Sequence, residues 1–249
     1  MKIVIPSHKR ADRVKTLKLV PNAILCVEEK QFEDYKKFNP DVEIVCHPNE
    51  VVGLVAKRNW MAKYFGDLFM LDDDIVAFKK NYIEKGESCA IKKPEEIIHK
   101  IECLNEVAKL MNISLYGFSN KVSPVMYNEF EPLSLRSHIT GCAYGVVYNQ
   151  NIQWDESFSL KEDFLISCTV KYKERKILVD HRYCFIQEKT MTNPGGLSEI
   201  RTNKKEIENI LRMRYYFGES VVLKNDRASN GKDNITQKVK NNISTKFIL

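Results

Sequence analysis

Short apolar runs alternate with helix-like stretches through the first half of the chain. In the helix-like stretches, apolar residues recur every three or four positions, whereas the apolar runs are short and compact. Strands that alternate with helices are typical of a parallel sheet covered by helices on both faces. The expected strands are 2–6, 23–27, 42–47 and 68–71, and the expected helices are 28–38 and 55–65.

The second half continues the same pattern with longer elements. Residues 94–111 form a clear amphipathic helix, with Ile97, Ile101 and Leu104 on one stripe. Strands are expected at 114–119, 139–148 and 176–186, and another helix at 204–217. We therefore predict an α/β fold with a mostly parallel central sheet, built as a single domain over residues 1–223. Residues 224–249 are predicted to be a basic, mobile tail.

Composition and the cysteine pattern favour a soluble globular protein that is not secreted. It has 249 residues, of which 43% are hydrophobic and 29% charged. Three aspartates interrupt its best apolar stretch, and the run before Pro6 is too short for a signal peptide, so no membrane insertion is expected. The 7 cysteines never form a CxxC pair. They predict free thiols in a reducing cytoplasm, that of a host cell if the gene belongs to a phage.

Net charge changes the picture only near the C-terminus. Residues 201–249 carry 11 Lys and Arg against 5 Asp and Glu, so the whole surplus of +6 lies there. A basic segment favours a polyanionic partner, of which nucleic acid is the first candidate. A solvated tail without a partner is the alternative.

Three consecutive aspartates, Asp72, Asp73 and Asp74, directly follow the apolar run 68–71. Adjacent carboxylates repel one another unless a cation compensates them, and oxygen ligands suit Mg²⁺ or Mn²⁺. In an extended segment, alternate side chains face the same side. We therefore predict that Asp72 and Asp74 share a metal ion, and that Asp73 faces away as an orienting or structural group. A solvated acidic turn is the alternative.

Two further polar motifs precede the aspartates. Arg58 and Asn59 lie in the helical stretch 55–65, and this residue pair can bind phosphate or hold a carboxylate. A cationic loop follows the first strand and contains Pro6, Ser7, His8 and Arg10. Ligands of parallel sheets bind beyond the carboxyl ends of the strands, which is where this loop lies. An exposed helix charge and a basic surface turn are the alternatives.

Taken in this order and spacing, these motifs resemble those of GT-A glycosyltransferases. More narrowly, the chain resembles the TET/JBP-associated glycosyltransferases, which include phage enzymes and the base-J glucosyltransferase. The resemblance covers residues 1–80 well and 138–201 in outline. It implies a nucleotide-sugar-binding α/β domain that uses a UDP-sugar, such as UDP-glucose, with Mn²⁺ or Mg²⁺. The implied acceptor is a 5-hydroxymethylated pyrimidine in DNA, in a phage or bacterial DNA-modification setting.

The resemblance also implies roles for individual residues. Asp72 and Asp74 take the places of the metal-binding pair, and Arg58 lies where these folds orient the nucleotide sugar. The other residues expected to bind the nucleotide sugar are Pro6, Ser7, His8, Arg10, Asn59, Asp72, Asp73 and Gly141. Glu162 and Asp163 resemble the acidic pair that opens a helix, in which Asp163 takes the acceptor proton if the reaction inverts. A helix-capping role is the alternative for that pair. His181 is implied as a metal ligand, with His138 as the other candidate and a purely structural histidine as the alternative.

Glycines and aromatic residues supply the remaining candidates. Gly141 and Gly145 allow close approach of the backbone to a sugar, although a tight turn uses glycine equally well. Gly195 and Gly196 mark either a loop that closes over the donor or an ordinary loop. An acceptor base exposed by flipping would need a stacking partner. The candidates are Trp60, Tyr144 and Trp154, each of which is otherwise a packing residue.

The leading hypothesis is therefore a metal-dependent glycosyltransferase that modifies DNA. Within the same chemistry, the alternative is a transferase acting on a surface saccharide or a lipid-linked saccharide. A nucleotidyltransferase would also need carboxylates, a metal and an α/β sheet. A non-catalytic DNA-binding module would explain the basic C-terminal segment but leave the aspartates unexplained.

Overall fold

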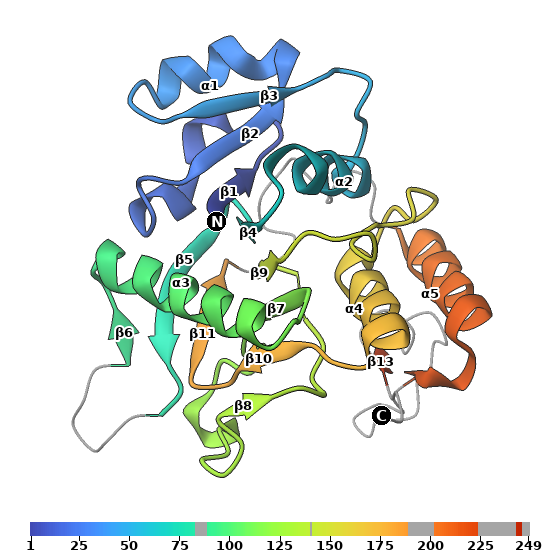
Figure 1. The fold of residues 1–249 in the computed structure, drawn as a ribbon. Coiled ribbons are helices and arrows are strands. Elements are labelled where there is room, and N and C mark those ends of the chain that lie inside the picture. The colour runs from blue at the N-terminus through green and yellow to red at the C-terminus, as the bar shows by residue number, and fades with distance from the viewer. Residues whose placement is uncertain (83–88, 140, 189–201, 224–242, 246–249) are drawn as a thin grey trace, which may run out of the picture.

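The computed structural model describes residues 1–82, 89–139, 141–188, 202–223 and 243–245. Its main sheet is built from β1 (Lys2–Pro6), β2 (Ile24–Glu28), β3 (Ile44–His47), β4 (Leu68–Leu71), β7 (Leu115–Phe118), β8 (Leu133–Ser134), β9 (Ala143–Val146) and β10 (Leu178–Asp180). The strand order is β3-β2-β1-β4-β9-β7-β10-β8 (Figure 1). Strands β8 and β9 run opposite to the others, so the sheet is mostly parallel, as predicted.

Helices cover both faces of this sheet. They are α1 (Phe32–Phe38), α2 (Leu54–Phe65), α3 (Pro94–Leu110), α4 (Glu162–Glu174) and α5 (Asn203–Phe217). Alternation along β4 sends Phe69 and Leu71 into the apolar cluster with α1 and α3, and Met70 into the cluster with α2 and α4. Helix α5 packs on α4 through Ile210 and Met213. The predicted α/β class, with helices on both faces, is confirmed.

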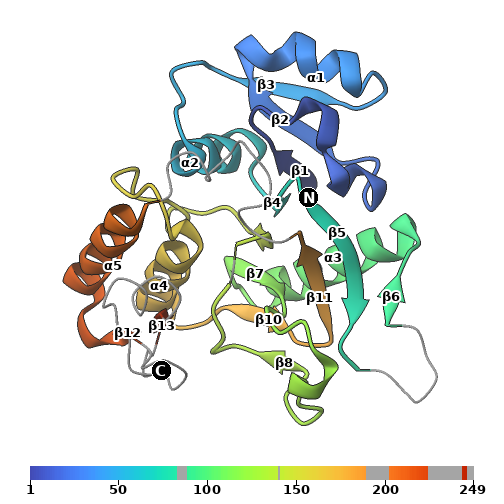
Figure 2. The same ribbon diagram turned by 180° about the vertical axis from the view of Figure 1, so that it is seen from behind.

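A smaller antiparallel sheet lies beside the main one. It has the order β11-β5-β6, with β11 (Tyr183–Gln187), β5 (Ile75–Lys80) and β6 (Ala90–Ile91), and Figure 2 shows β11 and β5 side by side. The prediction of one strand over 176–186 is wrong, because a turn at 181–182 divides it between the two sheets. The Asp180 carboxylate stabilises that turn by accepting the backbone N–H of Arg182 at 2.9 Å.

The bounds of most other helices and strands lie close to the predicted ones. Strands β1 and β4 have the predicted limits, and the neighbouring elements shift by a few residues. Strand β12 (Val221–Leu223) pairs antiparallel with β13 (Ile243–Thr245), which brings part of the predicted tail back to the domain. Residues 224–242 and 246–249 lie outside the described part of the chain. No helix of the described ranges has the length and apolar character needed to cross a membrane.

Gly145 in β9 provides a test of how tightly the sheet is packed. A Cβ at this position would overlap the ring of Tyr116 on the adjacent strand β7. The Tyr116 ring is buried, and its hydroxyl donates to Asn105 Oδ1 at 2.9 Å, so it has little freedom to move. Gly145 therefore makes room for a core ring. One of its two expected roles, close approach of the backbone to a sugar, does not fit this position.

Gly145→Ala is expected to lower the free energy of unfolding by about 1–3 kcal/mol, because overpacking forces neighbouring groups to shift. Urea denaturation followed by circular dichroism measures this change. Gly141→Ala is the matched control, since a Cβ there would meet the Asp163 carboxylate at 3.4 Å, an ordinary contact. Equal stability of the two variants would contradict the prediction.

Candidate active site

The candidate site lies where the order of the main sheet changes direction. From β1, the chain continues to β2 on one side, whereas β4 is added on the other side. The carboxyl ends of parallel strands at such a switch point form the crevice in which α/β sheets bind ligands. The loop after β1 and the aspartate turn (Asp72–Asp74, after β4) meet here. The structure thus brings together two motifs that are more than 60 residues apart, Ser7 and Asp73.

Asp73 joins the loop after β1 to the aspartate turn. Its carboxylate accepts hydrogen bonds from the Ser7 hydroxyl at 2.5 Å and from Arg10 Nη1 at 2.7 Å. The Tyr35 hydroxyl lies 2.7 Å from Ser7 Oγ and accepts the backbone N–H of Arg10 at 3.1 Å. Asp73 is itself buried. Asp73 therefore holds two loops together, although it lies in a turn and not in the extended segment that the prediction assumed.

Asp72 and Asp74 face a common partner, Gln187 at the end of β11. The Gln187 amide nitrogen donates to Asp72 Oδ2 at 3.3 Å and to Asp74 Oδ1 at 2.8 Å. Burial raises the pKa of Asp72 to about 8, and the charges of Asp74 and Glu162 act in the same direction. Burial likewise raises the pKa of Asp74. Two carboxylates that are costly to ionise thus converge on one point, and a cation there would relieve that cost.

His181 is not part of this carboxylate pair. Its backbone carbonyl accepts from the Asn81 side chain at 2.9 Å, and Asn81 follows β5 while Asp74 precedes it. At about 3.3 Å per strand residue, the length of β5 puts these ends about 20 Å apart. The Nε2 atom of the His181 ring lies 3.1 Å from the Ser137 hydroxyl. The predicted set of Asp72, Asp74 and His181 is therefore not assembled.

The other candidate, His138, stacks on Phe164 of α4 with ring centroids 5.1 Å apart. Within the described ranges, no three His, Cys, Asp or Glu side chains come together as a potential metal site. The metal-binding potential of the site therefore rests on the two aspartates alone.

Arg58 connects the aspartate turn to the start of α4. Its side chain is only 1% exposed, and Nη2 lies 3.4 Å from Asp72 Oδ1 and 3.3 Å from Glu162 Oε1. The guanidinium also lies over the Tyr144 ring, 4.8 Å from its centroid. These contacts exclude the alternative of an exposed helix charge. A buried arginine that bridges two carboxylates fixes the distance between the aspartate turn and the acidic pair.

The acidic pair holds the loop before β9 against α4. Asp163 Oδ2 accepts the backbone N–H of Gly141 at 2.9 Å, and Oδ1 accepts the N–H of Phe164 at 2.9 Å. Glu162 is buried against Arg58, whereas Asp163 is partly exposed. Asp163 therefore combines the expected helix-end contact with a position beside the aspartate turn, and of the two carboxylates it is the one accessible to a ligand.

Asn59 holds a carboxylate, which is one of the two roles expected for it, and it also holds the backbone of Trp154. Its amide group donates to the carbonyl of Trp154 at 2.8 Å and accepts the N–H of Trp154 at 2.8 Å. It also donates to Glu156 at 2.9 Å. Both ends of the amide are thus used to hold the segment before α4. The structure does not direct Asn59 toward a nucleotide.

The remaining residues of the first loop lie toward β2. His8 Nδ1 lies 2.8 Å from the Gln31 amide nitrogen and 3.7 Å from Glu28 Oε2. Pro6 is buried as the last residue of β1. The loop therefore presents His8 on the β2 side of the crevice and Arg10 on the side of the aspartates.

Two buried groups of the site were missed by sequence reasoning. Lys57 on α2 is buried and donates from Nζ to the Ser7 carbonyl at 2.8 Å, and burial lowers the pKa of this ammonium group. In the sequence, this lysine resembles any surface charge of a helix. Tyr35 on α1 carries no local signal for its contact with Ser7. Both depend on how α1 and α2 pack around β1.

Two of the three residues predicted to stack on an acceptor base cannot reach a ligand. Trp154 and Tyr144 are buried in the core. Trp60 stacks on Tyr64, also on α2, with ring centroids 4.6 Å apart. An acceptor ring would therefore need other aromatic partners. The predicted closing loop at Gly195 and Gly196 lies outside the described residues.

Comparison with known proteins identifies the family. No curated protein matches the chain. Similar solved structures include S. aureus TarS 1–349, at 12% identity and a TM-score of 0.48, covering 88% of this chain and 73% of that one. The same fragment in complex with UDP-GlcNAc has 11% identity and a TM-score of 0.48, covering 96% and 70%. The model of the TET-associated glycosyltransferases matches residues 1–196. The chain therefore belongs to the TET-associated glycosyltransferase family, as the resemblance of its motifs indicated.

Proposed function

We propose that this glycosyltransferase moves a sugar from a UDP-sugar to a 5-hydroxymethylated pyrimidine in DNA, with the help of Mn²⁺ or Mg²⁺. The observation that carries the proposal is the convergence of Asp72 and Asp74 on one point at the switch of the sheet. Arg58, Glu162 and Asp163 lie directly beside that point. The site thus has a place for a diphosphate and, next to it, a carboxylate for the acceptor.

The residues at the aspartate turn fit a divalent cation. Mg²⁺ in phosphate-transfer sites is commonly bound by one or two carboxylates, with phosphate oxygens and waters as the other ligands. Asp72 and Asp74 supply such a pair, and both accept hydrogen bonds from one neutral donor, the Gln187 amide. A cation held there supplies charge stabilisation to the departing diphosphate. Arg10, at 3.6 Å from Asp74, adds positive charge on the donor side.

The transfer itself needs one proton acceptor. In the inverting reaction, the hydroxymethyl oxygen of the acceptor attacks C1 of the sugar while the bond between C1 and the diphosphate oxygen breaks. The hydroxyl proton passes to Asp163, and the electron pair of the broken bond leaves with UDP. Asp163 suits this role because it is the accessible member of the acidic pair, whereas Glu162 is committed to Arg58.

The pKa of Asp72 makes cation binding depend on pH. Below pH 8, Asp72 of the folded protein holds a proton that a cation must displace, so the affinity for Mn²⁺ is expected to rise between pH 6.5 and 8.5. Without a cation, folding favours the protonated form of Asp72. The contribution of this form to the free energy of unfolding is lost as the pH rises through about 8.

Calorimetric titration with Mn²⁺ at several pH values measures this dependence. The affinity should change by up to about tenfold per pH unit below the pKa, as expected for displacement of one proton. Asp72→Asn should abolish the slope along with most of the binding. A wild-type affinity that stays constant between pH 6.5 and 8.5 would contradict the prediction.

The direct test of the proposed function is a transfer assay with radiolabelled UDP-glucose, Mn²⁺ and defined DNA. The substrates are DNA containing 5-hydroxymethylcytosine, DNA containing 5-hydroxymethyluracil, and unmodified DNA as the control. Label is expected in one or both hydroxymethylated DNAs and not in the unmodified DNA. Absence of label from all DNAs, together with transfer of label to a saccharide and release of UDP, would instead favour the saccharide acceptor.

A further inference from the structure

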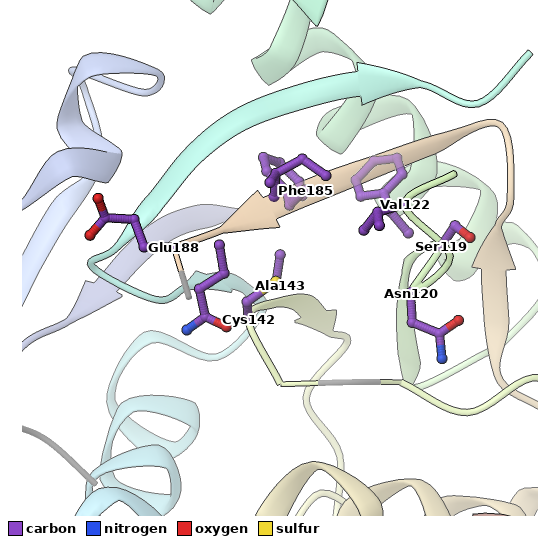
Figure 3. Close-up of a pocket in the computed structure, with 10 residues that line it drawn as sticks. Ser119, Asn120, Val122, Cys142, Ala143, Phe185 and Glu188 are labelled. Carbon is purple, nitrogen blue, oxygen red and sulfur yellow. The ribbon is translucent and has the colours of Figure 1, made fainter. Parts of the chain in front are cut away.

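A pocket of about 380 Å³ lies next to the aspartate turn. It opens at the ends of β7 and β11 and at the start of β9 (Figure 3). Its lining residues are Phe118, Ser119, Asn120, Val122, Cys142, Ala143, Phe185, Ile186, Gln187 and Glu188. This volume falls in the range of ordinary small-ligand sites. None of the residues predicted to stack on an acceptor base lines it.

Three of the residues that line the pocket contact the aspartate turn. The backbone N–H of Asp72 donates to the Cys142 carbonyl at 2.8 Å, and that of Glu188 donates to the Asp74 carbonyl at 3.1 Å. Gln187 lines the pocket and also bonds both carboxylates. A ligand in the pocket would therefore lie beside the proposed diphosphate position.

The walls of the pocket suit a flat ring with a polar edge. Phe118 and Phe185 form its apolar part, with ring centroids 5.7 Å apart at 69°. Both rings belong to a larger aromatic cluster with Phe69 and Phe78, so their positions are fixed by packing. Asn120 supplies an amide that can both donate and accept hydrogen bonds. Figure 3 shows Asn120 and Glu188 at opposite ends of the pocket.

From these contacts we infer that the pocket receives the acceptor pyrimidine, turned out of the DNA helix, with Asn120 reading its polar edge. The inference rests on the proposed function and adds the place and the recognition of the acceptor. A base inside a duplex cannot reach a catalytic carboxylate, and enzymes that modify bases bind them in such pockets. The hydroxymethyl group would then lie on the side of Cys142, the residue that follows Gly141 and its bond to Asp163.

Filling the pocket tests the inference without disturbing the core. Val122 lines the pocket and is 55% exposed, so Val122→Trp should fold and narrow the pocket. Val125→Trp is the matched control, because Val125 is 93% exposed in the same loop and does not line the pocket. Two rates are measured for each protein, namely sugar transfer to hydroxymethylated DNA and hydrolysis of the UDP-sugar by water. UDP binding is measured by calorimetry.

Val122→Trp is expected to reduce transfer to DNA by about tenfold or more, while UDP binding and hydrolysis stay near the wild-type values. The Val125→Trp control should match the wild type in all three measurements. Loss of UDP-sugar hydrolysis together with transfer would overturn the inference, because the pocket would then hold the donor sugar. Unchanged transfer by Val122→Trp would overturn it as well.

Asn120→Ala tests the recognition of the base. Loss of a paired amide contact changes discrimination between bases by about tenfold or more. The ratio of rates on 5-hydroxymethylcytosine and 5-hydroxymethyluracil DNA should therefore move toward one, and an unchanged ratio would overturn the role of Asn120. If the wild-type protein labels no hydroxymethylated DNA, the proposed function fails and the inference fails with it. Wild-type labelling that Val122→Trp leaves intact overturns the inference alone.

Discussion

Asp74→Asn is expected to reduce sugar transfer by about 100-fold or more while the protein stays folded. The substitution keeps the size of the side chain but removes one of the two charges that converge on Gln187. Loss of a group that stabilises charge in the transition state typically costs two to three orders of magnitude in rate. The radiolabel assay measures the rate, and a thermal shift with UDP and Mn²⁺ measures binding. That shift should shrink together with the rate.

Asp12→Asn is the matched control for this experiment. Asp12 lies in the same loop region as Arg10 but is exposed, and its partner is the neighbouring Arg13. Its loss should leave transfer and the thermal shift unchanged. Full activity of Asp74→Asn would contradict the assignment of a cation to the aspartate turn. Retained UDP and Mn²⁺ binding with lost transfer would instead restrict Asp74 to the chemical step.

Arg58→Met is expected to lower the free energy of unfolding by about 3–5 kcal/mol, the usual cost of removing one partner from a buried ion pair. The change leaves the buried Glu162 carboxylate without the guanidinium that lies 3.3 Å from it, and it also removes the 3.4 Å contact of that guanidinium with Asp72. For a protein of this size, each kcal/mol corresponds to about 2–4 °C in Tm. Differential scanning calorimetry should therefore record a fall of roughly 6–20 °C.

Two further variants test whether the buried ion pair of Arg58 is the cause of the lost stability. Arg212→Met removes an exposed arginine paired with Glu208 on α5, and exposed pairs contribute only about 0–1 kcal/mol. Glu162→Met in addition to Arg58→Met should recover part of the lost stability, because one uncompensated carboxylate is gone. A Tm of Arg58→Met close to that of Arg212→Met would contradict the buried role of Arg58.

The sequence was informative where the signal is local. Compact apolar runs predicted β1 and β4 with their observed limits, since short buried strands of a parallel sheet show no polar alternation. The aspartates could be assigned to the mouth of β4 for the same reason. Alternation then predicted that Asp72 and Asp74 face one side. The two do share Gln187, but Asp73 and Asp74 lie in a turn and not in an extended segment, and both contact Arg10.

The sequence was uninformative where function depends on contacts between distant segments. Gln187 reaches the aspartates only because the turn after Asp180 moves β11 into the second sheet. The same turn carries His181 to the opposite end of β5, which no spacing rule foresees. The contact of Asn59 with the backbone of Trp154 was not foreseen, because the two residues lie 95 positions apart. A helix residue next to a true site residue has no sequence mark that distinguishes the two.

The position of Asp73 has a consequence for how mutations in the aspartate turn are interpreted. Asp73 joins Ser7 and Arg10 to the turn and takes no part in the shared contact with Gln187. Its replacement by alanine would therefore act through loosening of two loops. Asp73→Ala should therefore lower the free energy of unfolding together with the transfer rate, because Ser7 and Arg10 lose a hydrogen-bond partner, whereas Asp74→Asn should lower the rate alone. The three neighbouring carboxylates thus divide into one that holds two loops together and two that face a common ligand position.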